Sequence, residues 1–136
     1  MRKLFDSIKK RPINLCMIIF TALFYLLNNA VFKFMTYGSL QLYFVCYFND
    51  MICPLLFLPY VNILLLTRGR EMCKLHHMLL LCFASGIIWE VLAPVLKPSA
   101  KADVWDMFFY LLGGSIYWGI YKLTVKRITK SWRCRK

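Results

Sequence analysis

Apolar residues in this chain fall into long runs, each about as long as a membrane-spanning helix. A helix needs about 20 predominantly apolar residues to cross a hydrocarbon core of ~30 Å. The runs predict four such helices, at residues 13–32, 49–66, 77–96 and 106–124. The predicted fold class is therefore all-α, a polytopic membrane protein whose four transmembrane helices form one bundle and a single domain over residues 1–136.

The second run is the one that the pattern leaves open. Asn49 and Asp50 separate the apolar stretch Leu40–Phe48 from Met51–Leu66. One interpretation makes Leu40–Phe48 an interfacial or re-entrant segment that precedes the span. The alternative is a single tilted helix from residue 40 to residue 66, which would carry Asp50 toward the middle of the membrane, where a carboxylate is costly.

Composition supports the membrane interpretation. Hydrophobic residues make up 60% of the chain and aromatic residues 17%, with a mean hydropathy of +0.57. These values lie above those of ordinary soluble domains. Four spans leave only short loops, so we expect no soluble catalytic domain.

The distribution of basic residues predicts an orientation. Of the eighteen Lys and Arg residues, fifteen lie in the N-terminal arm 1–12, the loop 68–74 and the tail from residue 122. Short segments rich in Lys and Arg remain cytoplasmic. Both basic ends, residues 1–12 and 125–136, are therefore predicted to be cytoplasmic in a multi-pass protein of the bacterial cytoplasmic membrane.

The net charge of +12 also bears on partners. Its division among three segments around apolar runs argues against nucleic-acid binding and favours membrane lipids, with anionic lipid at the cytoplasmic face. The six cysteines include no CxxC pair, so no disulfide framework is predicted.

Acidic residues gather at the opposite edge of the predicted spans. Four of the six, Asp50, Glu90, Asp103 and Asp106, lie at the outer ends. An ionisable group within a span costs roughly 2.5–3.5 kcal/mol on insertion scales, so its retention indicates a functional site. The alternatives are a helix-capping role for either aspartate of the last span and a structural hydrogen bond for Glu90.

Helical spacing tests whether these groups can meet. Residues 86, 90 and 93 share one face of the third span, and residues 103, 106, 110, 113 and 117 share one face of the fourth. Small residues on such faces allow close helix packing, and we assign that role to Gly86, Gly113 and Gly114. The predicted ligand- or cation-binding residues are Asn49, Asp50, Glu90, Asp103, Asp106 and Tyr110.

The chemistry of this set favours a cation or a hydroxyl-rich ligand. Carboxylates and carbonyl oxygens suit Mg²⁺ or Ca²⁺, which are the candidate ions; no other cofactor is predicted. No nucleophile paired with a base is present at this edge, so binding is expected rather than catalysis.

Two family resemblances follow from these residues. The stretch Trp89–Gly114, with Glu90, Asp106 and Gly113, resembles the signature region of VanZ-like membrane proteins. The sequence also resembles short bacterial membrane proteins labelled magnesium citrate secondary transporters, through the Asn-Asp step followed by Cys53 and Pro54. The first resemblance implies a role in the cell envelope.

The sequence therefore leaves two main functional hypotheses. The chain is predicted to be an accessory envelope protein that binds a lipid headgroup, a lipid-linked ligand or a cation. The alternative is a small secondary transporter or transporter subunit, coupled to protons or cations such as Mg-citrate, in which Glu90 acts within a homo-oligomer. Transport requires access from both faces, and the apolar pattern predicts no acidic residue in the inner half of any span. A purely structural role for the acids is the third possibility.

Overall fold

The chain is described from a computed structural model, which places residues 2–35, 37–96 and 104–133. Within these ranges the backbone forms helices and turns and no strand, so the predicted all-α class is confirmed. The elements are α1 (Arg2–Lys10), α2 (Pro12–Leu27), the π-helical turn η1 (Asn28–Phe32), α3 (Lys33–Met35), α4 (Ser39–Leu42), the π-helical turn η2 (Tyr43–Tyr47), α5 (Phe48–Thr67), α6 (Leu75–Leu96) and α7 (Val104–Arg133).

Local sequence explains two of the helix boundaries that position the bundle. Pro12 stands in the first turn of α2, where its fixed φ suits the helix and its missing N–H costs nothing. After α5, Gly69 adopts a φ of 71°, which an L side chain rarely takes. The Gly69 N–H then donates to the Leu66 carbonyl at 3.1 Å, and the Arg70 N–H donates to the Leu65 carbonyl at 3.0 Å. This paired arrangement is a Schellman motif, and it turns the chain from α5 toward α6.

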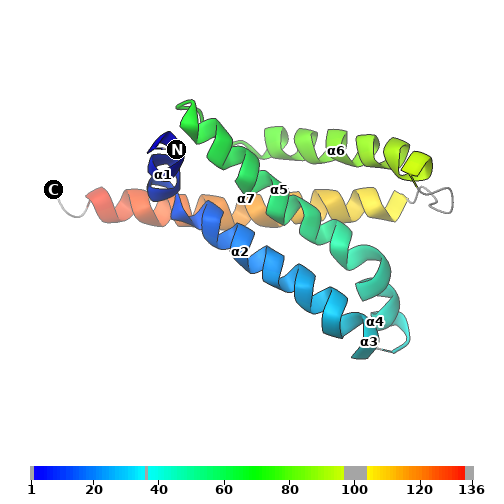
Figure 1. The fold of residues 1–136 in the computed structure, drawn as a ribbon. Helices are drawn as coiled ribbons and strands as arrows, with labels where there is room; N and C mark the ends of the chain where they lie inside the picture. The colour runs from blue at the N-terminus through cyan, green and yellow to red at the C-terminus, as the bar shows by residue number, and fades with distance from the viewer. Residues whose placement is uncertain (1, 36, 97–103, 134–136) are drawn as a thin grey trace.

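The region that the sequence left open is helical throughout. From Ser39 to Thr67 the backbone passes from α4 through η2 into α5 without a break, a continuity that both interpretations of this region allow. Figure 1 shows the ribbon curving where η2 joins α5. A π-helical turn is a recognised cause of such a bend.

The helices pack in the spatial order α2, α5, α7, α6. α5 packs against both α2 and α7, and α7 packs against α6, whereas α5 and α6 hardly touch each other. In Figure 1 the N-terminus, the α5–α6 turn and the carboxyl end of α7 lie at one end of the molecule. These are the segments that carry most of the basic residues.

The centre of the bundle is built on small residues of α6 and α7. A Cβ atom on Gly113 would overlap the backbone carbonyl oxygen of Met51 in α5, and one on Gly114 would lie 2.7 Å from the sulfur of Cys82 in α6. Gly86 in α6 faces a flexible methionine side chain of α7. All three glycines therefore lie at helix contacts.

Two of the described helices are long and apolar enough to cross a membrane. They are Pro12–Met35, with 24 residues, and Ser39–Thr67, with 29; Leu75–Glu90 is a shorter apolar helix. Only 17% of the most apolar window of the first helix is buried inside the protein. A helix in the core of a soluble protein would bury most of its apolar surface. These two candidate spans suggest that the chain associates with a membrane.

Candidate binding site

The end of the bundle opposite the basic segments carries the predicted acidic residues. Asp50 of α5 interacts electrostatically with Asp106 of α7 and with Glu90 of α6. All three side chains are partly buried. Asp50 therefore lies within electrostatic range of acids from two other helices, which are far from it in sequence. The fourth predicted acid, Asp103, lies outside the described residues.

Asn49, the neighbour of Asp50, takes part in a contact between helical segments. The amide nitrogen of Asn28 in η1 donates to the side-chain oxygen of Asn49 and to the carbonyl oxygen of Phe44, at 2.9 Å each. Asn28 is fully buried, and within the described part of the chain its own side-chain oxygen has no hydrogen-bond partner. Asn49 thus links α5 to the end of α2.

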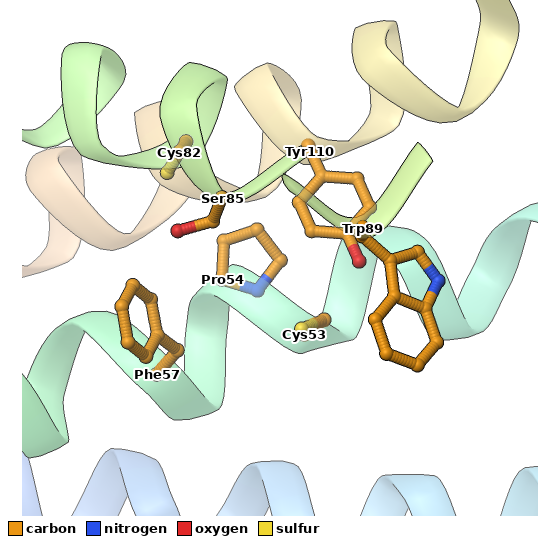
Figure 2. A pocket seen from close by; sticks show the side chains of 7 residues that line it. All are labelled: Cys53, Pro54, Phe57, Cys82, Ser85, Trp89 and Tyr110. Carbon is orange, nitrogen blue, oxygen red and sulfur yellow. The ribbon is translucent and has the colours of Figure 1, made fainter. Parts of the chain in front are cut away.

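Tyr110, the remaining predicted site residue, lies beside a cavity between α5 and α6. The cavity has a volume of about 170 Å³ and is lined by Cys53, Pro54, Phe57, Cys82, Ser85, Trp89 and Tyr110 (Figure 2). The Tyr110 hydroxyl is hydrogen-bonded to the Cys53 thiol. Tyr110 therefore borders a mainly apolar space next to the acids.

The charges around Asp50 indicate what could bind there. Within the described residues, both charged groups that act on Asp50 are themselves acidic. Carboxylates in this setting attract a cation or a hydroxyl donor. No three His, Cys, Asp or Glu side chains in the described ranges are grouped closely enough to hold a metal ion. Mg²⁺ and Ca²⁺ remain predicted ligands.

A second polar cluster, at the basic end, was not predicted. Arg11 donates from Nε to one carboxylate oxygen of Glu71 at 2.6 Å, and from a terminal nitrogen to the other at 3.4 Å. The Tyr121 hydroxyl donates to the first of these oxygens. Glu71 therefore joins the α5–α6 turn to the start of α2 and to α7.

Fully buried amides extend this cluster into the bundle. The Tyr117 hydroxyl donates to the side-chain oxygen of Asn14 at 2.9 Å and accepts from the Asn62 amide at 3.1 Å. The side-chain oxygen of Asn62 in turn accepts the backbone N–H of Met72 at 3.0 Å. We call Arg11, Asn14, Asn62, Glu71, Tyr117 and Tyr121 the inner network.

Sequence reasoning missed the inner network for identifiable reasons. Glu71 stands among basic residues in a turn, where the charge count was used to assign topology. Asn14 and Asn62 were absorbed into apolar runs. Buried amides in such runs are a usable signal, because a polar group inside a bundle needs a partner.

The pKa of Glu71 reflects this environment. Burial alone raises it, but hydrogen bonds from Arg11 and Tyr121 and the charge of Arg11 outweigh burial, so the pKa is held below its usual value. The same carboxylate raises the pKa of Arg11. The pair is therefore charged at neutral pH.

This shift predicts an acid-labile contribution to stability. A carboxylate with a lowered folded-state pKa stabilises the protein above its unfolded value of about 4.3, and this stabilisation is lost as the pH falls through the folded pKa. Thermal melts of detergent-solubilised protein from pH 7 to pH 3 should show a smaller acid-induced loss in E71Q than in wild type. D6N, which removes an exposed carboxylate of α1, is the control. Identical pH profiles for E71Q and wild type would contradict the role given to Glu71.

Comparison with protein-family models, curated proteins and solved structures gives no match. The resemblances to VanZ-like proteins and to proteins labelled magnesium citrate transporters therefore stay predictions. The function has to be inferred from the residues and their geometry.

Proposed function

We propose that this chain is a four-helix membrane protein of the cell envelope that binds a cationic or hydroxyl-rich lipid headgroup near the outer leaflet, as an accessory protein rather than an enzyme. The observation that carries the proposal is the electrostatic interaction of Asp50 with Glu90 and Asp106, which come from two other helices. Three partly buried acids on three helices are costly in a membrane unless they serve a purpose.

Support for the membrane location comes from length, composition and charge. Of the two candidate spans, Ser39–Thr67 packs on both Pro12–Met35 and α7, and α7 packs on α6, whose residues Leu75–Glu90 form a shorter apolar helix. The basic segments lie at one end of the bundle (Figure 1). The positive-inside rule then puts that end in the cytoplasm and the acids at the outer side.

The class of ligand follows from the spacing of the acids. They interact across helices but form no compact group of three metal ligands in the described ranges. A larger organic group, with an amine or several hydroxyls, can reach separated carboxylates more readily than a bare ion. We therefore favour a headgroup over Mg²⁺ or Ca²⁺ as the ligand.

The pairing of Glu71 at the basic end of the bundle favours binding over transport. A coupled transporter would need ionisable groups available from the inner face as well. Glu71, the acid of the inner network, already pairs with Arg11 and Tyr121. These interactions give Glu71 a structural role, which is to hold the α5–α6 turn against α2 and α7.

A thermal-shift titration tests the proposal. Detergent-purified wild type, E90Q and D6N are titrated separately with short-chain phosphatidylethanolamine, a short-chain glucosyl diacylglycerol, Mg²⁺ and Ca²⁺. A ligand of the folded state at about 100 times its Kd stabilises by ~2.7 kcal/mol. We expect such a rise with an amine or hydroxyl-bearing headgroup in wild type and in D6N, and its loss in E90Q.

Three results would overturn the proposal or its choice of ligand. No stabilisation of wild type by any of the four ligands would remove the outer site. An equal rise in E90Q and wild type would show that a ligand binds elsewhere. A rise in thermal stability with Mg²⁺ or Ca²⁺, but with neither headgroup, would show that the ligand is an ion and not a lipid.

A further inference from the structure

The gap between α5 and α6 is a second candidate binding region, separate from the acidic site. α5 and α6 both pack on α7 but hardly on each other. Toward the basic end, a cavity of about 490 Å³ opens between them. Its lining is Leu65, Arg70, Glu71, Met72, His77, Leu80, Leu81 and Ala84. Farther along the same gap lies the cavity of about 170 Å³ bordered by Phe57 and Tyr110.

The two cavities follow one another along the gap. α5 and α6 run antiparallel, and the first cavity uses the end of α5 and the start of α6, while the second uses the middle of each. The α6 residues that border them extend from His77 to Trp89. At 1.5 Å per residue this is about 18 Å. One leaflet of a hydrocarbon core of ~30 Å has a comparable depth.

Among the residues that line the two cavities, the charged side chains Arg70 and Glu71 and the imidazole of His77 all lie at the basic end. Arg70 and His77 line the first cavity, and both side chains are exposed. Glu71 also borders it, but its two oxygens accept hydrogen bonds from Arg11, which balances its charge. The amino-terminal end of α6 lies here as well and favours a negative group. The remaining walls of this first cavity, including Leu80 and Ala84, are apolar.

We infer that this groove holds an anionic phospholipid of the cytoplasmic leaflet, with its phosphate at Arg70 and His77 and one acyl chain along the gap between α5 and α6. The inference rests on the proposed membrane location. Charge complementarity selects the anionic headgroup, and the apolar length of the groove selects a lipid over a soluble anion. The site is distinct from the outer acids in both position and sign of charge.

Native mass spectrometry of the detergent-purified full chain tests this site. The probes are phosphatidylglycerol and phosphatidylcholine with identical acyl chains, each titrated alone and in the presence of inorganic phosphate. Wild type is expected to bind phosphatidylglycerol about fivefold more tightly, the difference that one surface charge of ~1 kcal/mol produces. R70Q/H77Q should lose this preference. A84F, which places a ring in the groove, should weaken the binding of both lipids.

Two matched variants test whether the effects come from this site or from any lost charge in the turn or any enlarged residue on α6. R68Q removes an exposed charge of the same turn, and I88F enlarges an exposed residue of α6; neither residue lines a cavity of the groove. Both should behave as wild type. Equal binding of the two lipids by wild type, an equal loss in R68Q, or unchanged binding in A84F would overturn the inference. Displacement of the lipid by inorganic phosphate would identify a site for soluble anions instead.

The need for detergent during extraction distinguishes a failure of the proposed membrane location from a failure of this inference. A chain recovered from cells without detergent would overturn the proposed function itself. A protein that requires detergent for extraction but shows no lipid preference would overturn only this inference.

Discussion

Replacing Gly113 with alanine is expected to destabilise the bundle by about 2 kcal/mol or more, because overpacking at a helix contact typically costs 1–3 kcal/mol. The added Cβ would overlap the carbonyl oxygen of Met51, which is a backbone atom and cannot rotate away. α5 and α7 would have to separate along their shared interface, which is the most extensive in the bundle. Unfolding by a denaturing detergent, followed by circular dichroism, measures the loss.

G119A is the matched control for this prediction. Gly119 lies on the same helix, and a Cβ there would meet nothing within 4 Å. Alanine is favoured over glycine in a helix by roughly 1 kcal/mol, so G119A should be as stable as wild type or slightly more so. G114A should fall between the two, since its Cβ would meet the Cys82 side chain rather than backbone. If G113A proved as stable as G119A, the close approach of α5 and α7 would be wrong.

Much of the fold could be predicted because apolar run length is a strong signal for helices of this kind. Each of the four predicted segments is helical, and the helix bounds agree with the predicted ones to within a few residues at most ends. The exception is α7, which continues to Arg133, beyond the apolar run that ended at residue 124. Helix formation depends on backbone hydrogen bonds and does not require apolar side chains. For the same reason Asn49 and Asp50 interrupt the apolar pattern of the second segment but not its helix.

Helical spacing shows which residues of one helix share a face, and this is the only part of the candidate site that the sequence could predict. Spacing along α6 and α7 placed acids on faces that could meet, and Asp50, Glu90 and Asp106 interact in the structure. Spacing within one helix cannot reveal a partner on another. Arg11 and Tyr121 lie 60 and 50 residues from Glu71, and no local pattern joins them.

Tyr117 illustrates the same limit. It shares a helical face with Tyr110 and Asp106, and that face was assigned to the outer acids. Three turns of a helix span about 16 Å, so residues on one face can serve opposite ends of a bundle. Tyr117 belongs to the inner network, where its hydroxyl contacts Asn14 and Asn62.

Asn62 gives the second large expected effect. In N62L the backbone N–H of Met72 loses its acceptor, and the Tyr117 hydroxyl loses its donor. A buried group left without a partner costs about 1–3 kcal/mol, so we expect a destabilisation of about 2 kcal/mol. The turn between α5 and α6 should also loosen, because the contact of Asn62 with Met72 holds it to the bundle. Limited trypsin digestion, which cleaves after Arg70 and Lys74, measures that loosening.

N29L tests whether the effect belongs to the network or to any asparagine in an apolar helix. The amide of Asn29 donates to the Tyr25 carbonyl one turn earlier in an exposed setting, and its side-chain oxygen accepts from Lys33. Loss of such local bonds within one helical turn should cost at most a few tenths of a kcal/mol and leave the α5–α6 turn as resistant to trypsin as in wild type. Equal trypsin sensitivity of N62L and N29L would mean that Asn62 does not anchor the turn. Glu71 would then have to hold it alone, and E71Q should become the variant that trypsin cleaves fastest.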